Sequence, residues 1–383
     1  MIRIDKKASI DSSEAFLNEI SAGSADLALS ERLHDTACGG AAAIAQVVFT
    51  WARQNPSASF TPLLDCNRDL GDLVKRLPGL IAIMMAGKIG NEEADEGAER
   101  RRAYAAAKEI VSKMDEREYR NTTKGIGVSL VCADETTKAY LSPFYASAQN
   151  RRPVLRAEEE FQYLASKLLE AAVNQVRFDE VVHLANDLGV MIRELIDNTD
   201  RYARQDINGN RLRKSVRGLH AQSHHVSPDR INSLAGEYAP LARYLTRIEQ
   251  RMRFKTAQIL EISIFDSGPG FAAHAMGRQI PSDYDIGEEL KLVRSRFLER
   301  NHEYTRDGAG KGLRRTLERL KKDSGFIRLR TGRTSLYKDF SLGSETKFTP
   351  EDMQLDDAFG GHPAARAEGT LLTLLVPLAV NSA

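Results

Sequence analysis

The chain has 383 residues, a length that predicts two or three domains at roughly 100–200 residues each. Its 54 Lys and Arg residues almost balance its 53 Asp and Glu residues, and the net charge of +1 gives no global field for a polyanion. This charge disfavours a nucleic-acid coat protein and a polybasic membrane binder, and 42% hydrophobic with 28% charged residues excludes wholesale disorder and a collagen-like fibre.

The number of cysteines and the lengths of the apolar runs indicate the cellular compartment of the protein. Cys38, Cys66 and Cys132 are an odd number without metal-ligand spacing, which argues against a disulfide framework and for reducing surroundings. The first residues lack the continuous apolar stretch of a secretory signal. The longest apolar run, residues 77–87, is far shorter than the roughly 20 residues that cross a bilayer, so we expect a buried helix there. We therefore expect a cytoplasmic protein without a membrane partner.

Residues 1–150 read as an α/β domain of unknown role. Residues 40–53 have the pattern of a packed helix, residues 91–108 that of an exposed helix, and residues 128–132 that of a buried strand. A polar cluster that ends in proline, residues 146–153, is the best linker candidate. We therefore place a domain boundary at about residue 150.

Residues 151–383 read as a second, larger domain. Helical patterns alternate here with apolar strands, and a polar stretch rich in Arg and His, to which we assign no strand, follows the second helix. The predicted helices are residues 161–176, 181–203, 231–252, 288–300 and one that starts at 313, and the predicted strands are residues 259–265, two segments within 325–340, and 370–377. The last strand is almost entirely apolar, as in the centre of a sheet.

The first candidate motif is the pair Glu194 and Asn198 within the second helix. Residues four apart lie on one helix face and can address one ligand. A carboxylate there can deprotonate a water molecule, and an amide oxygen can bind magnesium. The same spacing is also common on solvated helices.

The second motif is DSGPG, residues 266–270, directly after the strand at 259–265. Asp266 places an acceptor for an exocyclic amine at the strand end, while Gly268 and Gly270 let the backbone pass close to a bound ring. The alternative is a simple strand-ending turn.

The third motif is GAGKGL, residues 308–313, which leads into a helix. Successive backbone N–H groups and a helix N-terminus favour a phosphate, although the motif is neither a Walker A loop nor a Rossmann fingerprint. A flexible loop is the alternative. Finally, Thr370 opens the last strand with a hydroxyl that can donate and accept.

In this order, the four motifs resemble the boxes of the GHKL superfamily of gyrase, heat-shock chaperones, histidine kinases and MutL. The resemblance covers residues 158–378 and implies an α+β sandwich of the Bergerat type that binds ATP and Mg²⁺. The interval of 68 residues from Asn198 to Asp266 is longer than in most histidine kinases and predicts an inserted helix.

The resemblance implies a role for each matching residue. Glu194 corresponds to the general base and Asn198 to the magnesium ligand, while Arg201 stands where histidine kinases often carry a residue that contacts phosphate. Asp266 corresponds to the acid that reads adenine, with Thr370 in support. The remaining matches are those beside the adenine ring, Gly268 and Gly270, and those of the phosphate-binding lid, Gly308, Gly310, Lys311 and Gly312.

Three activities remain open. We expect an ATPase in which closure of the lid switches a protein partner, the N-terminal domain or a homodimer. The alternatives are a nucleotide-gated module that does not hydrolyse ATP, and a histidine or serine protein kinase. His34 superficially resembles a phosphoacceptor, but the hairpin that should join it to the ATP domain is missing.

Other polar groups have ordinary explanations. His220, His224 and His225 have no cysteine nearby in the sequence, so we do not expect a closed zinc site. Arg-rich stretches at 211–217 and 293–300 have few interleaved aromatics and read as solvated faces rather than nucleic-acid contacts.

Overall fold

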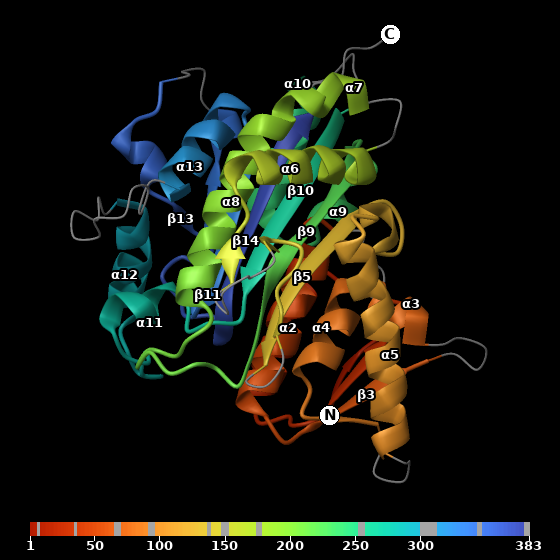
Figure 1. The fold of residues 1–383 in the computed structure, drawn as a ribbon. Helices are drawn as coiled ribbons and strands as arrows, with labels where there is room; N and C mark the ends of the chain where they lie inside the picture. Colours follow the sequence, from red (N-terminus) through yellow and green to blue (C-terminus); the bar gives the residue numbers. More distant parts are fainter. Residues whose placement is uncertain are drawn as a thin grey trace.

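The computed structural model describes residues 1–5, 8–33, 37–64, 70–90, 96–135, 139–146, 153–173, 178–251, 257–298, 312–342 and 347–378. Its strands form a four-stranded sheet, an eight-stranded sheet and a short two-stranded sheet, and helices cover the two larger ones (Figure 1). The mixed α/β fold class expected from the sequence is confirmed. No helix in the described ranges has both the length and the apolar character to cross a bilayer.

The first sheet is parallel and follows chain order, because a helical segment connects each strand to the next. Its strands are β1 (Ile2–Ile4), β2 (Leu27–Ser30), β3 (Ser59–Leu63) and β4 (Lys88–Ile89). Its helices are α1 (Ile10–Ser21), α2 (Gly40–Gln54), α3 (Leu70–Val74) and α4 (Leu77–Met85), followed by α5 (Glu96–Asp115). We call residues 1–90 the N-terminal module.

The predicted helices of the first 150 residues are present. Every residue of α2 from Gly40 to Ala52 is buried, and α4 is the buried helix expected from its apolar run. The described part of the expected exposed helix belongs to α5, which also buries one face through Ala103, Ile110 and Met114. Alanine-rich and apolar sequences therefore identified the helices correctly, while α5 is less exposed than its charge indicates.

The second sheet is antiparallel throughout, in the order β13-β12-β11-β14-β10-β9-β5-β6. Its strands are β5 (Val128–Glu135), β6 (Ala139–Tyr140), β9 (Lys214–Val226), β10 (Ala257–Asp266), β11 (Phe326–Gly332), β12 (Thr334–Asp339), β13 (Asp356–Asp357) and β14 (Ala367–Leu378). β14 lies between β11 and β10, which is the central position predicted from its apolar sequence. β5 pairs with β9 along its whole length, so the large sheet begins upstream of the boundary that we expected near residue 150.

Helices cover both faces of the large sheet. α6 (Glu158–Ala172), α8 (Ala185–Tyr202) and α13 (Gly312–Lys322) pack on one face (Figure 1). α2 packs against β14, β10 and β9 on the other face. Because α2 also contacts α1 and α4, it lies between the large sheet and the rest of the N-terminal module, which explains its complete burial.

The long interval between Asn198 and Asp266 holds more than the inserted helix we expected. It contains α9 (Ile231–Ala235) and α10 (Ala239–Arg251), separated at Gly236, and also β9, a strand of 13 residues. The sequence predicts no strand in this polar stretch, whereas β9 lies inside the sheet between β10 and β5. The remaining described elements are β7 (Tyr145–Ala146), β8 (Val154–Leu155), α7 (Phe178–Val181), α11 (Phe271–Met276), α12 (Ile286–Leu298), and short 3₁₀ helices at Tyr119–Asn121, Val182–Leu184, Phe340–Leu342 and Pro350–Met353.

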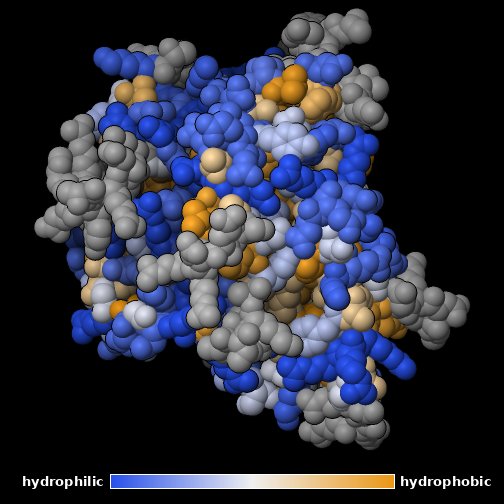
Figure 2. Space-filling model, in the orientation of Figure 1, coloured by the Kyte–Doolittle hydropathy of each residue, from blue (hydrophilic) through white to orange (hydrophobic). Residues whose placement is uncertain are grey.

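The outer surface matches the composition. Hydrophilic residues cover most of the face drawn in Figure 2, and apolar residues form only small areas on it. The described residues visible on this face therefore form no broad apolar patch for a partner.

Candidate nucleotide site

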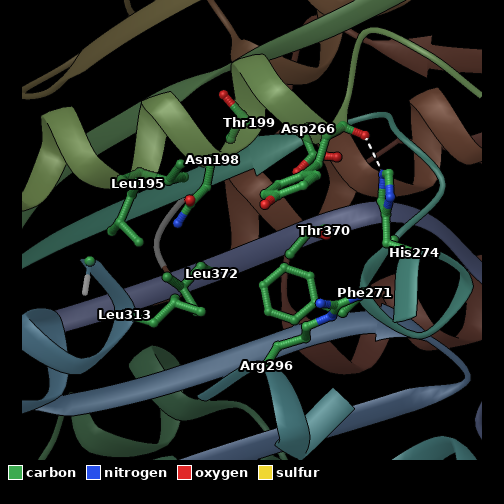
Figure 3. Close-up of a pocket in the computed structure, with 14 residues that line it drawn as sticks. Leu195, Asn198, Thr199, Asp266, Phe271, His274, Arg296, Leu313, Thr370 and Leu372 are labelled. Carbon is green, nitrogen blue, oxygen red and sulfur yellow. Dashed lines mark hydrogen bonds between the residues drawn. The ribbon is translucent and has the colours of Figure 1, made fainter. Parts of the chain in front are cut away.

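Helix α8 presents polar residues toward the large sheet beside apolar ones. Leu195 and Thr199 are buried on this helix, and they line a cavity together with Asn198. Figure 3 shows the Asn198 side chain directed into this cavity. The Asn198 amide therefore lies on the helix face that looks onto the sheet.

Glu194 lies one turn before Asn198 but is not among the residues that line the cavity. One carboxylate oxygen is hydrogen-bonded and ion-paired to Arg315 of α13. The other, Oε2, is buried without a hydrogen-bond partner among the described residues. Burial raises the pKa of Glu194, against the opposing effect of Arg315. Glu194 is therefore close to the start of α13, where Gly312 leaves room for it.

Asp266 ends β10, directly opposite Thr370 of β14. Its Oδ1 accepts a hydrogen bond of 2.9 Å from the backbone N–H of Gly268. The side chain is buried at the cavity, and burial raises the pKa of Asp266 to about 6, although Gly268, Arg53 and Thr370 act in the opposite direction. A buried carboxyl with an elevated pKa in a cavity is typical of a functional site.

Close backbone contacts bring the ends of β10 and β14 together. Gly369 has φ of +65°, and a Cβ at this position would lie 1.8 Å from the carbonyl oxygen of Asp266. The Gly369 N–H donates to the Gly268 carbonyl at 2.9 Å. Any side chain at residue 369 would therefore separate Asp266 from Thr370.

The cavity has a volume of about 930 Å³, including solvent space at its mouth, which is within the usual range for small-molecule sites of roughly 300–1,000 Å³. Five of the predicted site residues line it, and they come from four separate segments: Asn198, Asp266, Gly270, Gly312 and Thr370. The sequence did not indicate the other lining residues, which are mostly apolar or aromatic: Leu195, Thr199, Tyr202, Ile264, Phe271, His274, Arg296, Leu313 and Leu372. Aromatic and aliphatic walls with a few polar groups are typical of pockets that bind a flat ring.

Besides Glu194, two further predicted site residues do not line the cavity. Arg201 does not line the cavity and forms an ion pair of 2.6 Å with Asp197, one turn away on the same helix. Gly268 packs against the end of α8, since a Cβ there would lie 2.6 Å from the Ala203 Cα. Gly268 therefore positions α8 against the strand end. Gly308, Gly310 and Lys311, like His34, lie outside the described residues.

His274 of α11 lines the cavity and contacts the end of α8. Its Nε2 lies 2.7 Å from the Tyr202 carbonyl oxygen, and the two rings meet edge to face with centroids 5.1 Å apart (Figure 3). Burial lowers the pKa of His274. Sequence patterns could not identify this residue because α11 has only six residues.

Helix α2 of the N-terminal module supports the same strand ends from behind. Arg53 donates from Nε to the Ser267 carbonyl at 3.0 Å and from Nη2 to the Ser267 hydroxyl at 3.2 Å. The backbone N–H of Glu368 donates to Thr50 Oγ1 at 3.0 Å. Ser267 follows Asp266 and Glu368 lies two residues before Thr370, so α2 fixes both residues from the opposite face of the sheet.

Comparison with protein-family models, with curated proteins and with solved structures found no match to this chain. Evidence for the function of this chain therefore comes from the residues and the geometry of the cavity.

Proposed function

We propose that the cavity between α8 and the large sheet binds ATP with Mg²⁺, as the resemblance to the GHKL superfamily implies. One observation carries the proposal: Asn198, Asp266, Gly270, Gly312 and Thr370 were selected from four separate motifs, and all of them line one cavity. These positions span 172 residues of the chain, and three of the motifs have common structural explanations when taken singly. Their convergence on one concave site favours a shared ligand.

The adenine ring would lie among the apolar residues, with its exocyclic amine donating to Asp266. The ionised carboxylate accepts only, so it selects a donor at this position. Thr370 would add a hydroxyl beside it, and Gly369 keeps the two residues together. Guanine carries a carbonyl oxygen where adenine carries the amine, so the same acid disfavours GTP.

The phosphates would lie toward the start of α13. Gly312 begins this helix, and backbone N–H groups at a helix N-terminus bind anions. The contribution of Gly308, Gly310 and Lys311 remains a prediction from the sequence, and the pairing of Arg201 with Asp197 weakens its assignment to a phosphate.

Asn198 fits the proposed magnesium ion because its side chain enters the cavity and its amide oxygen is a hard donor. A bound magnesium ion would offset phosphate charge. The chain's own contribution is to hold the amide on a buried helix face one turn from Glu194.

The role of Glu194 distinguishes an ATPase from a nucleotide-gated module that does not hydrolyse ATP. In an ATPase Glu194 is the base, and Oε2, which has no hydrogen-bond partner in the part of the chain that the structure describes, is the atom available to accept a proton. The ion pair with Arg315 instead favours a nucleotide-gated module that binds without hydrolysis, because the cation keeps the carboxylate away from the cavity. We propose the ATPase first and the binding module second, with lid closure switching the N-terminal module or a partner. A protein kinase is third.

Equilibrium binding of ATP to the intact protein with Mg²⁺ tests the proposal. We expect ATP to bind more tightly than GTP, and Asp266→Asn to weaken ATP binding by at least about tenfold, since a buried charged acceptor is lost. Tyr163→Phe, on the exposed part of α6, is the matched control and should bind as the wild type does. Absence of ATP binding by the wild type, or equal affinity in Asp266→Asn, would contradict the proposal.

Labelled γ-phosphate separates the three activities once binding is established. Release as inorganic phosphate indicates an ATPase, transfer to the chain or to a partner indicates a kinase, and binding without either indicates the nucleotide-gated module.

A further inference from the structure

A second polar cluster lies on the opposite face of the large sheet from the cavity. It joins Cys38, directly before the start of α2, to His224 of β9 and Glu261 of β10. One potential ligand atom from each residue lies within 4.8 Å of the other two, and all three side chains are buried. Cys38 and His224 are far apart in the sequence, so the fold supplies the cysteine that the histidine group lacks in the sequence.

We propose that Cys38, His224 and Glu261 bind a zinc ion that fixes the N-terminal module to the large sheet. A thiolate sulfur, an imidazole nitrogen and a carboxylate oxygen are the three donor types that zinc takes in proteins. Each comes from a different segment, so binding would join the residues just before α2 to β9 and β10 at one point.

The surroundings of Glu261 hold its carboxylate in place. Oε1 accepts from the Ser263 hydroxyl at 2.9 Å, and Oε2 accepts from the Gly39 backbone N–H at 2.8 Å. Hydrogen bonds that orient a ligating carboxylate are typical of the outer shell of a metal site. His220 lies on the same sheet face, with Nδ1 bonded to Ser129 and with Nε2 buried and unpartnered among the described residues.

An ion pair without metal is the competing explanation. His224 Nε2 lies 2.8 Å from Glu261 Oε2. Burial opposes the charged imidazole, but Cys38 and Glu261 together raise the pKa of His224 to about 10. This explanation accounts for the histidine and the carboxylate and gives the Cys38 thiol only a contact with His224. Zinc uses all three groups and offsets the cost of burying the negative charge.

The position of the proposed zinc site indicates that the metal would hold α2 against the large sheet. Cys38 lies at the start of α2, and Arg53 near the end of α2 binds the loop that follows Asp266. Zinc at one end and Arg53 at the other would fix the whole helix across the back of the sheet. The metal would therefore be structural, since the cluster is buried and Glu261 lies five residues along β10 from Asp266, on the opposite face of the sheet.

The metal content of the intact protein, purified under reducing conditions without chelators, tests the inference. We expect about one zinc ion per chain in the wild type, and Cys38→Ser and His224→Ala should each lower this at least about tenfold. Two matched controls should retain the metal: Cys132→Ser, a second buried cysteine, on β5, and His225→Ala, the exposed neighbour of His224.

Cobalt substitution of the wild type provides a readout that needs no variant to fold. We expect a thiolate-to-cobalt charge-transfer absorption band, with zinc displacing the cobalt. A wild type that holds neither ion after exposure to both, or a cobalt spectrum without the thiolate band, would overturn the proposal. Equal zinc content in folded Cys38→Ser and wild type would overturn it as well.

Discussion

Replacing Asp266 with asparagine should stabilise the protein progressively as the pH rises. A folded-state pKa of about 6, compared with an ordinary value of 3.8, means that the folded protein keeps a proton that the unfolded chain has lost. The burial penalty is absent below pH 3.8, grows between pH 3.8 and 6, and is complete above pH 6. At about 1.36 kcal/mol per pH unit, the full penalty is about 3 kcal/mol. Asparagine carries no charge and escapes this penalty.

The pH dependence isolates the charge effect from the changed hydrogen bonds. About half of the penalty, roughly 1.6 kcal/mol, is already present at pH 5, so the free energy of unfolding of Asp266→Asn relative to wild type should rise by about 1.4 kcal/mol between pH 5 and pH 8. A constant difference in hydrogen bonding to Gly268 cancels in this comparison. Urea unfolding at the two pH values, without nucleotide, measures it.

Tyr163→Phe again serves as the control and should show no such rise. A relative stability of Asp266→Asn that stays constant or falls from pH 5 to pH 8 would refute the reasoning, because it would mean that Asp266 ionises in the fold without a burial cost.

Three further predictions concern the nucleotide. ATP affinity of the wild type should fall as the pH is lowered through about 6, because protonation removes the acceptor of Asp266, and Asp266→Asn should lack this dependence in the same titration. Arg53→Ala should weaken ATP binding by roughly 5–30-fold although Arg53 does not line the cavity, since it loses two hydrogen bonds to Ser267 worth about 1–2 kcal/mol in total; unchanged affinity by calorimetry would show that support by α2 is unimportant. If the protein hydrolyses ATP, Glu194→Ala should lose turnover by about 100-fold or more while retaining binding, and Arg315→Ala, which frees the carboxylate, should keep or raise it; in a phosphate-release assay, full turnover in Glu194→Ala would exclude the proposed base.

The helices and strands that the sequence predicts correctly are those that bury mainly apolar side chains. α2, α4 and β14 are rich in apolar residues, and β10 has apolar residues at most of its positions, so composition distinguishes all four from loops. β9 escaped because its buried positions include Arg217, His220 and His224, which find partners only in the folded protein.

Partners distant in the sequence explain each of these polar residues. Arg217 pairs with Asp134 of β5 at 3.0 Å, and His224 faces Glu261 and Cys38. No local sequence pattern predicts such pairs, because burying a charged or polar side chain is costly unless its partner is also present in the fold. The same reason explains why Cys38 was not associated with the histidines.

The sequence also predicts only part of the candidate site. The sequence predicts polar and glycine site residues, such as Asp266 and Gly270, because they stand at the ends of strands and helices. The cavity wall residues, such as Phe271 and His274, were missed, because apolar and aromatic residues occur throughout the core and α11 is too short for a periodic pattern. The sequence predicts a phosphate contact for Arg201 from its position alone. In the structure, Arg201 forms an ion pair with Asp197, one turn earlier on the same helix.

A crystal structure of the protein with a non-hydrolysable ATP analogue and Mg²⁺ would show whether ATP binds in the cavity between α8 and the large sheet. We expect an adenine ring whose amine contacts Asp266 beside Thr370, with magnesium at Asn198 and phosphates at the start of α13. An analogue bound elsewhere, or an adenine ring in this cavity without contact to Asp266, would contradict the proposal.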